Sequence, residues 1–227
     1  MNELFIYDEL GPSAFGLISA KTVIQALSEF GDEDVTVRVN SPGGDANEGI
    51  AIGQALQRHP GNVTVVIDAL AASAATLFSP GADEVVMSPH GFFVTHDPFI
   101  VTIGGLAIHQ QRVEALDKMR DTIIDIYKDR VGNKVTRARL REMLDADEVW
   151  LNATEALGFG FVDRIDEEVP AVAANVGRLR GMPQDATIAS STEDITQKRE
   201  NDATLSVTAA KVRIKRRRLD VLTNRAE

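Results

Sequence analysis

The chain has 227 residues, of which 44% are hydrophobic and 26% are charged, a balance typical of a globular protein with a sizeable buried core. It contains no cysteine, which excludes disulfides, thiolate metal sites and a thiol nucleophile. The formal net charge of -10 disfavours nucleic acid as a partner for the molecule as a whole.

The first half of the chain alternates between predicted strands and helices. Strands are expected at residues 4–10, 35–40 and 63–70, and helices at about 19–30, 47–58 and 71–78. The segment 63–70 is a nearly continuous β-branched run, which is typical of a strand buried on both faces. Repeated strand–helix–strand units predict an α/β fold with a largely parallel sheet and right-handed crossovers.

The second half is predicted to be mostly helical. Two more strands, at 84–88 and 91–96, precede a long helix over about 106–130. Shorter helices at 135–144 and 154–158 and a last strand at 159–165 follow. The N-terminus does not have the pattern of a signal peptide, and no segment has the roughly 20 apolar residues of a membrane span. We therefore expect a cytoplasmic protein without membrane contact.

The composition changes after about residue 168. Residues 169–227 are rich in Ala, Ser and Thr without sustained apolar periodicity, so we predict a folded domain at 1–168 and a linker with a basic tail at 169–227. From Lys211 onward, seven basic residues stand against two acidic ones. Nucleic acid could bind only through this tail, by phosphate contacts; an acidic or apolar protein partner and a simply solvated end are the alternatives.

Three predicted loops carry residues suited to acyl-transfer chemistry. Gly43 and Gly44 follow a strand, where their amides can face a developing negative charge. Ser73 stands among alanines at a strand-to-helix junction, which suits a nucleophile elbow with the Ala74 amide at the helix start. His96 ends a strand at the edge where open α/β sheets bind ligands. Each feature alone is compatible with a plain turn, a buried serine or a structural histidine.

In their order and spacing, these motifs resemble the ClpP peptidase family. The matching segments are 40–44, 71–73 and 96–98, with His96 following Ser73 by 23 residues, and the resemblance extends over about residues 3–168. It implies a ClpP/crotonase-like fold of stacked βαβ units with a long helix, Ser73 as nucleophile and His96 as general base. It also implies oxyanion-binding amides at Gly44 and Ala74. No ligand cluster supports a metal ion or an organic cofactor.

The third member of the implied triad is less well defined by the sequence. Aligning Trp150 with the family segment that follows the triad aspartate assigns the role to Glu148, a departure from the usual aspartate. Asp147 is one residue away, and Asp163 near the end of the domain is a weaker candidate. The acidic run 145–148 could also be a solvated helix end.

Finer features resemble the phage ClpP-like proteases that mature virus heads. The serine is followed by alanine where glycine is usual in ClpP, and a basic extension of about 60 residues follows the domain. This resemblance implies a prohead protease that cleaves scaffold and capsid proteins during capsid assembly and virion maturation, without an ATPase. It also implies a homo-oligomeric ring in which the long helix is the stacking element. The tail would recruit the protease into the assembling head, where self-cleavage could remove it.

Other classes of protein remain open at this point. A housekeeping ClpP-type subunit and a non-catalytic assembly protein would share the fold. An acyl-CoA crotonase would use paired backbone amides without a serine nucleophile. A Ser-Lys peptidase is disfavoured because no lysine lies between Lys21 and Lys118. If His96 is the base, activity should fall on acidification, because a protonated imidazole cannot accept a proton.

Overall fold

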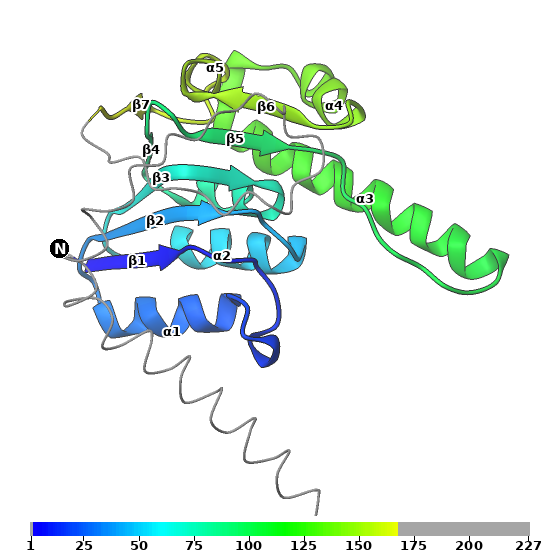
Figure 1. Cartoon of the computed structure of the whole chain (residues 1–227), viewed down its shortest axis with the longest axis horizontal. Helices are drawn as coiled ribbons and strands as arrows, with labels where there is room; N and C mark the ends of the chain where they lie inside the picture. The colour runs from blue at the N-terminus through cyan, green and yellow to red at the C-terminus, as the bar shows by residue number, and fades with distance from the viewer. Residues whose placement is uncertain (1, 168–227) are drawn as a thin grey trace, which may run out of the picture. The chain divides into compact units, whose positions relative to one another are not determined.

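The computed structural model describes residues 2–167 (Figure 1). The predictions made for the linker and the basic tail lie outside these residues. Within them, no helix is both long enough and apolar enough to cross a membrane. In the same part of the chain, no group of three or more His, Cys, Asp or Glu side chains could share a metal ion.

A seven-stranded sheet forms the centre of the described domain. Its strands are β1 (Asn2–Ile6), β2 (Val35–Ser41), β3 (Val63–Ala72), β4 (Glu84–Met87), β5 (Phe92–Thr95), β6 (Val149–Asn152) and β7 (Arg164–Ile165). The main path runs β1-β2-β3-β4-β7, and β5 pairs with the end of β3 and with β6. Every pairing is parallel except β5 with β6. The predicted α/β fold with a largely parallel sheet is therefore confirmed.

Five α-helices of the described domain connect its strands, and polar side chains cap several of them. They are α1 (Ala20–Phe30), α2 (Ala46–Gln57), α3 (Leu106–Val131), α4 (Arg137–Asp145) and α5 (Ala153–Phe159). Ser19 and Asp45 accept backbone N–H bonds at the starts of α1 and α2, and Asn152 and Glu155 form a capping box at α5. These helices lie within a few residues of the predicted ones.

The two faces of the sheet have different side chains. Valines at alternate positions of β2 are buried in the main core, which also contains the inward residues of α1 and α2. Arg38, which lies between two of these valines, bonds instead to the buried carboxylate of Asp68. Leu70, Ala72 and Val94 form a small separate apolar cluster with Phe92 and Trp150. The candidate site lies where the strands bearing this cluster end.

Several elements of the structure differ from those predicted. The helix expected at 71–78 is absent: β3 continues to Ala72, and only a four-residue 3-10 turn, η2 (Ser73–Thr76), follows. The strand expected at 159–165 is reduced to β7: Phe159 belongs to α5, and Gly160 ends that helix with a left-handed φ of 88°. Strand β6 was not predicted. The small residues at 71–72 extend β3 because β2 and β5 supply partners on both sides.

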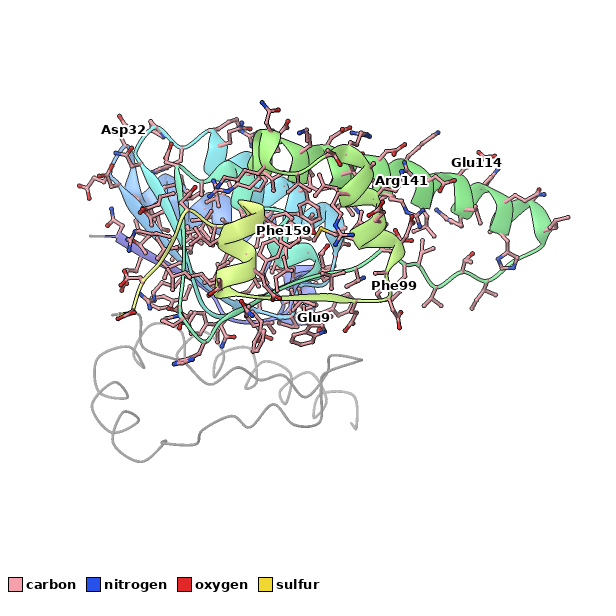
Figure 2. All side chains as sticks on the ribbon, turned by 90° about the horizontal axis from the view of Figure 1, so that it is seen from above. Glu9, Asp32, Phe99, Glu114, Arg141 and Phe159 are labelled. Carbon is pink, nitrogen blue, oxygen red and sulfur yellow. The ribbon has the colours of Figure 1, made fainter. Side chains whose placement is uncertain are left out.

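The first half of α3 and the segment before it extend beyond the sheet (Figure 1). Figure 2 shows side chains of this segment, Phe99 among them, pointing away from the body of the domain. Large apolar residues are exposed along both parts: Phe99, Ile100, Val101, Ile103, Leu106, Ile108 and Val113. Exposed apolar surface on this scale is typical of an interaction site.

Candidate active site

Ser73 lies in a strained turn at the carboxyl end of the central strand β3. Its φ is 53°, and it is the only non-glycine residue of the described part with a positive φ. A side chain in this left-handed region costs free energy, of the order of 1–3 kcal/mol, and such strain is concentrated at functional sites. Ala72 before it is extended, and the short 3-10 turn η2 begins at Ser73 itself. This is the strand-to-turn geometry that lifts a nucleophile out of a sheet.

The glycine loop packs directly against this turn. A Cβ added at Gly43 would lie 2.4 Å from the Ala72 carbonyl oxygen and 2.8 Å from the Ala74 nitrogen. Gly44 is held from the other side, where the loop pairs with Leu10 through the Gly43 carbonyl and the Asp45 amide. Among the hydrogen bonds of the described residues, the Gly44 amide donates none. No acceptor in the described part of the chain therefore competes for this N–H group.

His96 follows strand β5, the parallel neighbour of β3. Ala72 lies beside Val94 in this pairing, so both chains leave the sheet at the same edge, at Ser73 and just before His96. Both residues are partly exposed. The Nδ1 atom of His96 is 2.7 Å from the carbonyl oxygen of Asp97, and its ring lies 5.9 Å from that of Phe99.

Glu148 directly precedes strand β6, which pairs antiparallel with β5. Thr95 is opposite Val149, so the next pair in the same register is His96 with Glu148. Side chains that are opposite each other in an antiparallel pair project to the same face. Glu148 is partly buried, and its carboxylate accepts a hydrogen bond of 3.2 Å from Trp150 Nε1. Continued by one pair, this register would place the Glu148 and His96 side chains on the same face of the sheet.

The two other acidic candidates have different surroundings. Asp147 is exposed and lies one residue out of this register. Asp163 accepts the Val85 amide at 2.7 Å and pairs with Arg130, which holds it beside β4. Its carboxylate is therefore engaged away from the end of β5.

The structure places the ends of β3 and β5 and the start of β6 at the same edge of the sheet, but the hydrogen bonds of a catalytic triad are not formed. Among residues 2–167, no hydrogen bond joins Ser73 to His96 or His96 to Glu148. Catalytic hydrogen bonds are often long or open without a substrate, so the arrangement is compatible with a serine hydrolase.

One ion pair at this site could not be predicted from the sequence. Arg120 of α3 makes a two-point contact with Asp97, the residue after His96, and also lies 3.3 Å from Asp145 at the end of α4. The hydrogen bond to Asp97 raises the pKa of Arg120 above its ordinary value. Asp97 belongs to the motif that the sequence highlighted, but Arg120 is 23 residues away from it on a charged helix, where many arginines look alike.

A serine in a strained turn after a parallel strand, with a glycine loop on one side and a histidine at the neighbouring strand end, is the arrangement of an α/β serine hydrolase. The sequence profile described as Clp protease matches residues 4–169. The chain therefore belongs to the Clp protease family.

Individual relatives agree with this assignment. The ATP-dependent Clp protease proteolytic subunit 1 of Leifsonia xyli is 30% identical over 172 residues, which cover 70% of this chain and 80% of that protein. The ATP-dependent Clp protease proteolytic subunit of Streptococcus gordonii is 31% identical over 140 residues, covering 59% and 68%. A ClpP1 mutant from Listeria monocytogenes has a TM-score of 0.62 at 22% identity, covering 73% of this chain and 91% of that one. This last likeness concerns the fold.

Proposed function

We propose that this protein is a serine endopeptidase with Ser73 as nucleophile, His96 as general base and Glu148 as the orienting carboxylate. The observation that carries the proposal is the strained backbone of Ser73, at the same sheet edge as His96. Ser73 has a left-handed backbone conformation that costs free energy. Such strain is typical of functional sites, and here it would present the serine hydroxyl to a substrate.

The chemistry follows from these positions. His96 removes the proton from the Ser73 hydroxyl as its oxygen attacks the peptide carbonyl, and the Gly44 and Ala74 amides bind the oxyanion. Each such donor typically stabilises the transition state by about 2.7–4 kcal/mol. His96 then gives the proton to the leaving amine, and water hydrolyses the acyl-enzyme by the same steps. For Glu148 to stabilise the imidazolium, Nδ1 of His96 exchanges its contact with the Asp97 carbonyl for the carboxylate.

The substrate class we propose is scaffold and capsid protein during phage head maturation. The support is the alanine that follows Ser73 and the basic extension after the domain, both features of the resemblance to phage ClpP-like proteases. The second candidate is a housekeeping proteolytic subunit, which is favoured by the similarity to ATP-dependent Clp protease proteolytic subunits. A head-maturation protease would act without an ATPase, in assembling heads within the host cytoplasm. A housekeeping subunit would depend on a partner ATPase.

The test of the activity compares wild type with Ser73→Ala. Wild type should react covalently with a fluorophosphonate probe at Ser73 and should cleave a co-expressed scaffold or capsid protein, as seen by mass spectrometry. Ser73→Ala should do neither. Labelling that survives in Ser73→Ala, or none in wild type, would reject the proposed nucleophile. Cleavage that appears only with an added Clp ATPase would favour the housekeeping role.

The choice of carboxylate gives a second prediction. Glu148→Gln should lower kcat by about 10²- to 10⁴-fold with little change in KM, because the imidazolium loses its counter-charge while the side-chain shape is kept. Asp147→Asn and Asp163→Asn are the matched controls and should retain nearly full kcat. A larger loss in either control than in Glu148→Gln would move the role to that residue.

We also propose that the chain forms a homo-oligomer, in a ring, through α3. The support is the row of exposed apolar side chains on the segment that extends from the domain (Figure 2). An isolated chain would expose this surface to water, whereas association would bury it. Light scattering on the wild-type sample should give a multiple of the 24.6 kDa chain mass. A fully active monomer would reject the proposal.

A further inference from the structure

Three hydroxyl groups form a buried chain of hydrogen bonds beneath the candidate active site. The phenol oxygen of Tyr127, on α3, is 2.7 Å from Thr76 Oγ1 and 2.8 Å from Thr95 Oγ1. All three residues are at most 3% exposed. Thr76 ends the short turn that begins at Ser73, and Thr95 immediately precedes His96. Tyr127 therefore bonds to both backbone segments that carry the proposed nucleophile and base.

The donors of this chain can be ordered, because each hydroxyl has one proton. Thr76 Oγ1 donates to the Ser73 carbonyl oxygen at 2.5 Å, so it accepts from Tyr127. The single proton of Tyr127 is thereby used, and its oxygen accepts the proton of Thr95. Every hydroxyl proton in the chain has an acceptor, and hydrogen bonds in such a series strengthen one another.

The remaining surroundings of Tyr127 are apolar. Its ring stands edge-on to Phe161 at a centroid distance of 5.3 Å and lies 6.4 Å from Phe93. Burial raises the pKa of Tyr127 above its ordinary value, against the hydrogen bonds with the two threonines, so the phenol keeps its proton. A phenylalanine would fill the same ring volume. What the hydroxyl adds at this position is the link between two segments.

That link lies where the sheet no longer holds the two segments together. The β3–β5 ladder ends at the pair Ala72 and Val94, before either Ser73 or His96 is reached. Beyond this pair, the path Thr95–Tyr127–Thr76 connects the strand end to the turn. Because serine hydrolase catalysis requires nucleophile and base at hydrogen-bond distance, a fixed connection at this point bears directly on the rate.

We propose that Tyr127 is a positioning residue, whose hydroxyl holds the turn of Ser73 at a fixed distance from the strand end of His96. The proposal rests on the proposed function of Ser73 and His96. Tyr127 touches neither the substrate nor the reacting atoms. Its effect should therefore fall on the rate of attack by Ser73 and not on substrate binding.

The experiment measures this difference in Tyr127→Phe. The second-order rate constant for fluorophosphonate labelling of Ser73, and kcat for a fluorogenic peptide, should both fall about tenfold, while KM stays the same. Thr95→Val should give a similar loss. Both changes interrupt the same series of hydrogen bonds. The combined variant, Tyr127→Phe with Thr95→Val, should therefore lower the rate constants little more than either change alone.

Tyr7→Phe is the matched control. It also removes a tyrosine hydroxyl, one bonded to the buried Asp68 on the other face of the sheet. Both tyrosine variants should melt a few degrees below wild type, and rates should be compared at a temperature where circular dichroism shows them fully folded. Labelling should be unchanged in Tyr7→Phe. An equal loss in both variants would reduce Tyr127 to a structural role and overturn the proposal.

A structural comparison separates this proposal from the proposed function. If wild type does not react with the probe, the proposed function fails, and crystal structures of wild type and Tyr127→Phe still decide the positioning role. The distance from Ser73 Oγ to the His96 ring should be larger or more variable in the variant. An unchanged distance, or wild-type labelling rates in Tyr127→Phe, would overturn the proposal.

Discussion

Replacing His96 by alanine should slow peptide cleavage and the labelling of Ser73 by at least about 10⁴-fold. The serine hydroxyl is a poor nucleophile at neutral pH unless a base removes its proton during attack. Among the described histidines, His96 is the one at the end of β5, beside the strand that carries Ser73. Neither rate should recover on raising the pH moderately, because no other base takes its place.

The control is His90→Ala, which removes an exposed histidine from the turn between β4 and β5. It should retain nearly full activity. Stopped assays with a fluorogenic peptide measure the rates, and circular dichroism shows whether each variant is folded. If His96→Ala kept more than a tenth of the wild-type rate, another residue would have to be the base.

The strands are predicted best from the sequence where the local residue pattern alone favours an extended conformation. The β-branched run of β3 and the alternation of β2 are such segments, and both lie close to where they were expected. The end of β3 is different. Residues 71–72 are small and helix-compatible, and they are extended because β2 and β5 pair with them from both sides. The extended conformation of these residues depends on strand partners about 20 to 30 residues away in the sequence, which local propensity does not include.

The same distinction applies to the candidate site. The glycine pair, the serine among alanines and the histidine at a strand end could be selected from the sequence because each matches a local motif. Strand β6 could not, although its ladder with β5 ends at Thr95 and Val149, the residues next to His96 and Glu148. Neither could the contacts of Arg120 and Tyr127 from α3, since these residues meet Asp97, Thr76 and Thr95 only after the helix packs against the sheet. Residues that orient a site do so through contacts that exist only in the folded protein, so local sequence patterns do not identify them.

Replacing Gly43 by alanine should lower the activity at least about 100-fold and destabilise the fold by a few kcal/mol. The added Cβ would lie 2.4 Å from the Ala72 carbonyl oxygen and 2.8 Å from Ser73 Cβ, distances that real Cβ atoms do not tolerate. These neighbours are backbone atoms and the Cβ of the turn that carries Ser73, not the flexible end of a side chain. Relief therefore requires that the glycine loop and Ser73 move apart.

Gly16→Ala separates this contact from the strain of a positive φ. Gly16 has φ of 77° and Gly43 has φ of 86°, but a Cβ on Gly16 would meet nothing within 4 Å. Both substitutions place an alanine in the left-handed region, at about 1–2 kcal/mol each. Only the one at Gly43 displaces the turn that carries Ser73, so only that variant should lose probe labelling while still folded by circular dichroism. Equal losses of activity in the two variants would show that backbone strain, and not the close approach of the loop, controls the site.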